Sequence, residues 1–201
     1  MGEAVAKEVE VAYYNINRDD IVRQLRRLGA KFVGKYLQKR INFQVVTRGK
    51  AGAADYYTSW IRVREKNKKA TLTLKEQKGN KVTGRREYEV EISDFATMAR
   101  ILYKLLNNPE YDYFENYREE YSLLGTKITI DKFPSLPYIM EIEGATKKSV
   151  DSVLHKLKIK GEPDPNKSVP TAEYYRIHGH DYKPVQEKYK KKLETILKGL
   201  K

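Results

Sequence analysis

The sequence predicts an α+β fold in which strands curl into a closed or nearly closed barrel and helices pack outside it. First, the expected strands outnumber the expected helices. Second, nearly every strand has a period of two, with one apolar face and one charged face. Third, the charges on these faces are sorted by sign, because Glu141 and Glu143 share a face of one strand whereas Arg62 and Arg64 share a face of another.

Pairs of carboxylates recur on other strands. Glu8 and Glu10 flank a valine near the N-terminus, and Glu87, Glu89 and Glu91 alternate with apolar residues later in the chain. Carboxylates on one face repel each other and are costly to bury unpaired, so they need water, cationic side chains or a metal ion. A flat sheet with a wet polar face is one explanation. Sorted acidic and basic faces favour the other, a barrel with an ionic interior.

The N-terminal half of the chain is expected to form a strand, a helix and then four strands. Residues 7–14 alternate between acidic and apolar side chains. Asn17 is a typical N-cap for the helix that follows, and Gly29 is a typical C-terminal stop. The further strands are residues 36–46, 60–66, 71–77 and 85–92.

The C-terminal half repeats this order weakly, which suggests two strand–helix–strand–strand halves. Ser93 is expected to cap the second helix, which ends at residues 107–109, and Thr146 is expected to open the third. The strands between them are residues 114–123, 127–132 and 138–144. A basic helix is expected at residues 187–201, so we predict one domain over residues 1–183 and a basic helical extension over residues 184–201.

Charge and composition restrict the partners. The chain has 201 residues, a net charge of +13 and no cysteine. A strongly basic protein favours anionic partners, here nucleic acid, a nucleotide or a polyphosphate. The absence of cysteine excludes thiol chemistry and fits a cytoplasmic protein. No apolar run approaches the length of a membrane span, and the first residues lack the apolar core of a signal peptide, so no membrane partner is expected.

The ordered set of charged motifs resembles the CYTH superfamily, also called the triphosphate tunnel metalloenzymes. The family's opening Glu-x-Glu-x-Lys is matched at residues 8–11 but ends in Ala12, and its Arg-x-Arg strand is matched at residues 62–64. A Leu-Thr-Leu-Lys strand is matched at residues 72–75 and an Arg-x-Glu-x-Glu strand at residues 85–89. The later motifs are matched by Asn116, Arg118, Asp131, Glu141 and Glu143.

The resemblance implies an eight-stranded antiparallel β-barrel around a tunnel, with helices packed outside. It implies Mg²⁺ or Mn²⁺, which prefer oxygen ligands, at Glu8, Glu10, Glu89, Asp131, Glu141 and Glu143. It implies a triphosphate clamp made of Arg62, Arg64, Lys75, Arg85 and Arg118, since guanidinium groups match phosphate oxygens. Catalytic roles are implied for Glu8, Glu10, Arg62, Lys75 and Arg118.

Three functions remain open. The first is a metal-dependent enzyme that cleaves or cyclises a triphosphate such as ATP or another nucleotide, thiamine triphosphate or inorganic triphosphate, as an adenylyl cyclase or triphosphatase. The second is a non-catalytic nucleotide or polyphosphate binder, because Ala12 replaces the family lysine and cannot contact phosphate. The third is an RNA 5′-triphosphate binder or triphosphatase, favoured by the net charge. The protein is expected to be a monomer or a homodimer.

Other features have ordinary structural explanations. The carboxylate pairs could form salt bridges to arginines inside the barrel, and Arg62 and Arg64 could be a solvated strand face. His178 and His180 flank Gly179, which suggests a turn more than a metal site. The run of lysines at residues 190–192 is typical of a solvated helix face.

Overall fold

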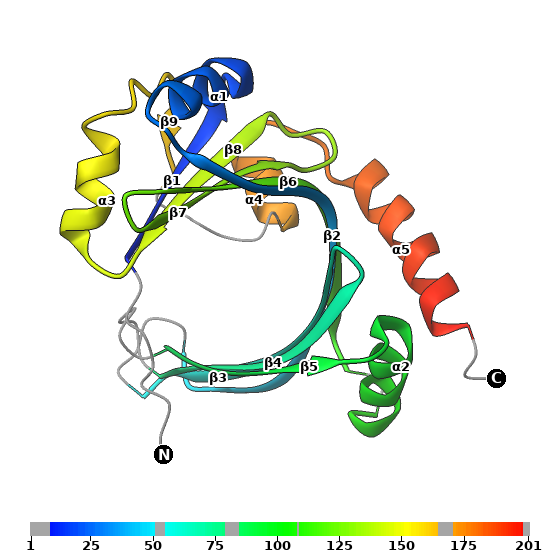
Figure 1. Ribbon diagram of the computed structural model, residues 1–201. Helices are drawn as coiled ribbons and strands as arrows, with labels where there is room; N and C mark the ends of the chain where they lie inside the picture. The colour runs from blue at the N-terminus through cyan, green and yellow to red at the C-terminus, as the bar shows by residue number, and fades with distance from the viewer. Residues whose placement is uncertain (1–8, 51–54, 79–84, 108, 165–170, 199–201) are drawn as a thin grey trace. The chain divides into compact units, whose positions relative to one another are not determined.

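The computed structural model describes residues 9–50, 55–78, 85–107, 109–164 and 171–198. Within these ranges the chain forms both strands and helices (Figure 1). The strands are β1 (Val9–Ile16), β2 (Lys31–Arg48), β3 (Tyr57–Lys66), β4 (Lys69–Lys78), β5 (Arg85–Ile92), β6 (Tyr111–Leu123), β7 (Thr126–Lys132), β8 (Tyr138–Gly144) and β9 (Glu162–Pro163). The helices are α1 (Arg18–Arg27), α2 (Phe95–Leu105), α3 (Lys147–Leu154), α4 (Ala172–Ile177) and α5 (Lys183–Leu197).

The described strands form one sheet with the order β5-β4-β3-β2-β6-β7-β8-β1-β9. Every ladder whose register is resolved is antiparallel. The predicted α+β class with an antiparallel sheet is therefore confirmed. The described residues contain nine strands instead of the expected eight, and the ninth is the two-residue strand β9.

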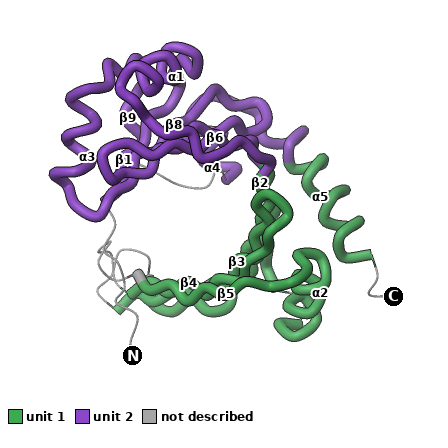
Figure 2. Tube along the Cα trace, viewed as in Figure 1, with its two compact units in different colours: residues 1–5, 38–115, 186–201 green, residues 6–37, 116–185 purple. Residues whose placement is uncertain are grey.

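The chain divides into two compact units (Figure 2). Unit 1 comprises residues 1–5, 38–115 and 186–201, and unit 2 comprises residues 6–37 and 116–185. Most of α5 thus belongs to unit 1. The predicted division at residue 183 between a domain and an extension stays a prediction.

Unit 2 has a core between one face of β1, β7 and β8 and the helices α1 and α3. Leu25, Ile128, Met140, Ile142 and Val153 are fully buried there. The helix starts follow local chemistry: the Asn17 side chain accepts a hydrogen bond from the Asp20 amide, and Thr146 forms a capping box with Ser149. Both starts agree with the sequence prediction, and so does the end of α1 at Gly29, whose φ is +75°.

The core of unit 1 lies on one face of β2 and β3. Ile41, Phe43 and Val63 are fully buried, and α2 contributes Phe95 and Leu102. The predicted cap of this helix was wrong by one residue. The side chain of Asp94, and not that of Ser93, accepts a hydrogen bond from the amide of Thr97. No helix in the described part of the chain is long and apolar enough to cross a membrane.

Candidate functional site

The face of β3 opposite the unit 1 core carries Trp60, Arg62 and Arg64. Alternation on the strand places these three side chains together, while Val63 points to the core. The register then puts polar residues beside them on both neighbouring strands. Arg62 pairs with Asn42 of β2 and Thr73 of β4, Arg64 pairs with Arg40 and Thr71, and Trp60 pairs with Gln44 and Lys75. Unit 1 therefore has one continuous polar sheet face.

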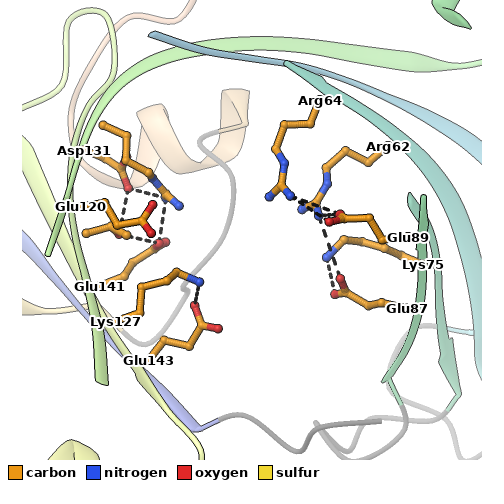
Figure 3. A network of polar contacts seen from close by, with 12 residues as sticks. Arg62, Arg64, Lys75, Glu87, Glu89, Glu120, Lys127, Asp131, Glu141 and Glu143 are labelled. Atoms are coloured by element: carbon orange, nitrogen blue, oxygen red, sulfur yellow. Dashed lines mark hydrogen bonds and ion pairs between the residues drawn. The ribbon is translucent and has the colours of Figure 1, made fainter. Parts of the chain in front are cut away.

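Three cations and two carboxylates meet on this face (Figure 3). Lys75 donates a hydrogen bond to Glu87, which is its cross-strand partner on β5. Nη2 of Arg64 lies 3.2 Å from Oε2 of Glu89, and Nη2 of Arg62 lies 3.6 Å from the same oxygen. Because Arg62, Arg64 and Lys75 come from adjacent strands and point to one side, they form a basic cluster that an anion can bridge. We call these three residues the unit 1 basic cluster.

The pKa values of the cluster reflect this crowding. Burial lowers the pKa of the Lys75 ammonium, and the charge of Arg62 lowers it further, against a smaller opposing effect of Glu87. Partial burial acts to raise the pKa of Glu89. The hydrogen bond from Thr73 (2.6 Å) and the charges of Arg64, Arg62 and Lys75 outweigh it, so that this pKa is lowered. An added polyanion would relieve the repulsion among the three cations.

In unit 2, Arg118 of β6 is fixed by carboxylates from β7 and β8. Its Nε donates to Oδ1 of Asp131 at 2.7 Å, its Nη2 donates to Oδ2 at 2.6 Å, and Nη2 also donates to Glu141 at 3.0 Å. Asp131 is 1% exposed and also accepts from the amide of Asn116 at 2.6 Å. Burial acts to lower the pKa of Arg118, but the charges of Asp131 and Glu141 raise it above its usual value, so the guanidinium stays charged.

The acidic residues of β1 and β8 share a face of unit 2. Glu10 lies opposite Glu143 in the register, and Glu141 is two residues from Glu143. Lys127 of β7 lies opposite Glu143 and donates a hydrogen bond to it. Carboxylate oxygens suit a hard cation such as Mg²⁺ or Mn²⁺. Within the described ranges, however, no three acidic or histidine side chains are gathered closely enough to hold a metal ion.

Two of the predicted site residues are not fully described. Glu8 lies outside the described residues. Arg85 is the first residue of β5, and only its backbone position is described. The others divide between the units: Arg62, Arg64, Lys75 and Glu89 belong to unit 1, and Glu10, Arg118, Asp131, Glu141 and Glu143 belong to unit 2.

The sequence did not predict a group of aromatic and acidic side chains that lies beside Ala12. Ala12 is 5% exposed, and its carbonyl accepts a hydrogen bond from the amide of Asp164 at 2.9 Å. The hydroxyl of Tyr174, from α4, donates to Oδ2 of Asp164 at 2.6 Å. Burial raises the pKa of Tyr174, and Asp164 and Glu141 add to the increase. The only sequence signal for α4 was Thr171, which caps it through the amide of Tyr174.

The two histidines after α4 pack against the same group. The ring of His178 stacks on Tyr14 with 3.7 Å between centroids, and Nε2 of His180 lies 2.8 Å from the hydroxyl of Tyr14. Gly179 between them has φ of +70°, in agreement with the predicted turn.

The chain is similar to known proteins in sequence and in fold. The CYTH domain matches residues 55–169 of the chain. A Methanocaldococcus jannaschii protein named "Putative adenylate cyclase MJ0240" is 29% identical over 153 residues, which are 76% of this chain and 82% of that protein.

Solved structures agree on the fold. The PH1012 protein of Pyrococcus horikoshii has a TM-score of 0.62 at 24% identity, covering 79% of this chain and 95% of that one. A Hippeastrum protein, HpAC1, described as an adenylyl cyclase candidate with a dominant triphosphatase activity, has a TM-score of 0.52 at 17% identity, covering 86% and 96%. Since the family match spans more than half of the sequence, the chain belongs to the CYTH domain family.

Proposed function

We propose that this protein is a metal-dependent enzyme that binds a triphosphate and cleaves or cyclises it at phosphorus. The observation that carries the proposal is the unit 1 basic cluster, in which Arg62, Arg64 and Lys75 converge from neighbouring strands on one polar face. Arginine forks bind phosphate oxygens in pairs, and a lysine adds a compact charge. The names of the Methanocaldococcus and Hippeastrum proteins support the same chemistry.

The cluster suits a chain of phosphates more than a single anion. Its three cations lie along one face, and the carboxylates of Glu87 and Glu89 are counter-charges to them. Both carboxylates belong to β5, which is an edge strand of the sheet, and their side chains are 47% and 41% exposed. Exposed ion pairs are weak. A triphosphate can therefore displace these carboxylates at modest cost and take up their cations.

The proposed metal ligands are Glu10, Glu141 and Glu143, with Glu8 as the fourth. Their type fits Mg²⁺ or Mn²⁺, and the register of β1 and β8 puts Glu10, Glu141 and Glu143 on one face, where their side chains would have to draw closer together to hold the ion. When bound, such an ion neutralises charge on phosphate oxygens. Asp131 and Glu89 stay predicted ligands, but both are bonded to arginines here. We favour a role for Asp131 in holding Arg118 charged and oriented.

The two reactions differ only in the nucleophile. Water attacking the terminal phosphorus releases phosphate and leaves a diphosphate. A ribose hydroxyl attacking the first phosphorus of a nucleoside triphosphate releases pyrophosphate and leaves a cyclic nucleotide. In both, Arg62, Arg64 and Lys75 of unit 1 hold oxygens on which negative charge develops, which is the main catalytic task in phosphoryl transfer. A phosphate contact of Arg118 stays a prediction.

A second candidate is a non-catalytic polyphosphate binder, and Ala12 is the observation that favours it. The residue lies opposite Glu141, on the same face as Glu10, and its methyl group supplies no charge there. The cations of unit 1 do not depend on Ala12. They can therefore bind a polyphosphate even where Ala12 prevents turnover.

A product assay decides between these functions. The protein is incubated with ATP, thiamine triphosphate or inorganic triphosphate and Mg²⁺ or Mn²⁺, and products are identified by chromatography. Arg62→Ala should reduce turnover at least tenfold. Arg86→Ala is the matched control, because Arg86 is an arginine on β5 at a position that alternates with Glu87. Metal-dependent binding without any product would support the binder, and equal loss in both variants would refute the proposed clamp.

A further inference from the structure

A cavity of about 620 Å³ opens beside the unit 1 basic cluster. Its lining comes entirely from unit 1: Asn42 and Gln44 of β2, Trp60 of β3, and residues 109–112 at the start of β6. The volume falls in the range of small-molecule sites. The phosphates of a ligand would bind to Arg62, Arg64 and Lys75, so the cavity is available for another part of the same ligand.

The register connects the cavity to the cluster. Trp60 is the cross-strand neighbour of Lys75, and Asn42 is the cross-strand neighbour of Arg62. Side chains that face each other across a strand pair have their Cβ atoms about 5 Å apart. A ligand with phosphates on Arg62 and Lys75 therefore has the cavity one residue pair away, within the span of a sugar.

The lining offers what an aromatic base requires. Trp60 supplies a partly buried ring on which any aromatic base can stack. A ligand that has no base cannot make this contact. Oδ1 of Asn42 is buried and has no hydrogen-bond partner among the described residues. An amide can satisfy both its donor and its acceptor on the edge of a purine.

The neighbouring residues fix the shape and the polarity of the cavity. The amide nitrogen of Gln44 donates to Thr58 Oγ1 at 3.0 Å and to Thr47 Oγ1 at 2.9 Å, and the Gln44 backbone amide donates to Glu110 at 2.9 Å. These hydrogen bonds hold the rim of the cavity in place. Glu110 and Asp112 also line the cavity, and their acidic side chains disfavour phosphate there. The cavity and the basic cluster therefore select opposite ends of one ligand.

We propose that this cavity holds the base of a purine nucleoside triphosphate, stacked on Trp60 and hydrogen-bonded to Asn42, while the phosphates lie on Arg62 and Lys75. The proposal rests on the proposed function and specifies its substrate class: a nucleotide in preference to inorganic triphosphate. Trp60 and Asn42 are then specificity-determining residues.

Trp60 is the only tryptophan in the chain, so its fluorescence reports on the cavity. ATP and inorganic triphosphate are each mixed with the protein and Mg²⁺ in a stopped-flow instrument, and the initial fluorescence change is recorded. ATP should quench the emission strongly, and inorganic triphosphate should change it little. Calorimetry in parallel gives Kd for both ligands. Trp60→Ala should weaken ATP binding about tenfold and leave triphosphate binding within twofold, whereas Trp60→Phe should retain most ATP affinity.

Asn42→Ala should also weaken ATP selectively. Tyr88→Ala is the control, since Tyr88 is an exposed aromatic on β5 and lies outside the cavity lining. Equal effects of Trp60→Ala on both ligands, or none on either, would overturn the base subsite. Triphosphate binding that depends on Arg62, with ATP bound no more tightly, would overturn the subsite and leave the proposed function standing. Failure of both ligands to bind would overturn both.

Discussion

Ala12 lies directly opposite Glu141 across the antiparallel pair of β1 and β8. Two residues earlier on the same face, Glu10 lies opposite Glu143. Position 12 therefore belongs to the acidic face of unit 2, and a lysine there would place its amine among carboxylates. Instead, Asp164 and Tyr174 lie beside this position and share a hydrogen bond.

Ala12→Lys should raise triphosphate turnover severalfold or more. The added ammonium would be attracted by Glu141 and Asp164 and would supply a cation for the phosphates. The measurement is kcat from phosphate or pyrophosphate release at saturating substrate. Ala12→Met controls for chain length without charge, and thermal unfolding checks that both variants fold. Turnover of Ala12→Lys no higher than that of Ala12→Met would show that the lack of a lysine at this position does not limit catalysis.

The strand faces could be predicted because alternation is a local property of the backbone. Arg62 with Arg64, and Glu141 with Glu143, share faces simply because they are two residues apart. Hydrogen-bonded caps such as Asn17 and Thr146 were found for the same reason. The class of fold and the candidate face of each strand therefore followed from the sequence.

Pairings between strands could not be predicted in this way. Nothing in the sequence says that Asp131 binds Arg118, because that pair depends on the register of β6 against β7. The contact of Tyr174 with Asp164 was missed because α4 is short and its neighbours along the chain are polar. The cavity at Trp60 was missed because the residues that line it come from three separate strands or loops.

Arg118→Ala should lower the free energy of unfolding by about 3 kcal/mol, because it leaves Asp131 buried without its counter-charge. Asp131 is 1% exposed and Arg118 is its bidentate partner. Urea unfolding of Arg118→Ala, Asp131→Ala and the double variant measures the coupling. The double variant should be more stable than the sum of the single losses predicts.

The control for this pair is Lys147→Ala. Lys147 forms an ion pair with Asp151 at 2.6 Å on the surface of α3, where its side chain is 81% exposed. Exposed helical pairs contribute less than about 0.5 kcal/mol. Strictly additive losses at Arg118 and Asp131 would mean that the two side chains do not depend on each other.

Lys75→Arg should remove an alkaline loss of triphosphate affinity. Burial and the charge of Arg62 lower the pKa of Lys75 below that of an ordinary lysine, so its ammonium loses a proton at a lower pH. Only the protonated form attracts phosphate, and affinity should therefore fall as pH rises through the lowered pKa. Arginine stays charged over this range.

The measurement is Kd for inorganic triphosphate by calorimetry between about pH 7 and 10, where lysine titrates and arginine does not. The wild type should lose affinity across the range and Lys75→Arg should not. Lys78→Arg is the control, because Lys78 is an exposed residue at the end of β4. Identical profiles of Kd against pH for wild type and Lys75→Arg would show that the titration of another group causes the loss of affinity at high pH.

Tyr189→Phe should destabilise the protein by about 1–2 kcal/mol, because α5 is part of the unit 1 core and Tyr189 fixes it to β6. The Tyr189 hydroxyl donates to the Glu115 carbonyl at 2.9 Å and accepts from the Glu115 amide at 3.2 Å, and both residues are buried. Leaving the two backbone groups of Glu115 unsatisfied carries this cost. Lys191→Ala, on the exposed side of the same helix, should leave the midpoint of thermal unfolding unchanged. If Tyr189→Phe also left that midpoint unchanged, α5 would be the basic extension that the sequence suggested, and its lysines would be the residues to test for RNA binding.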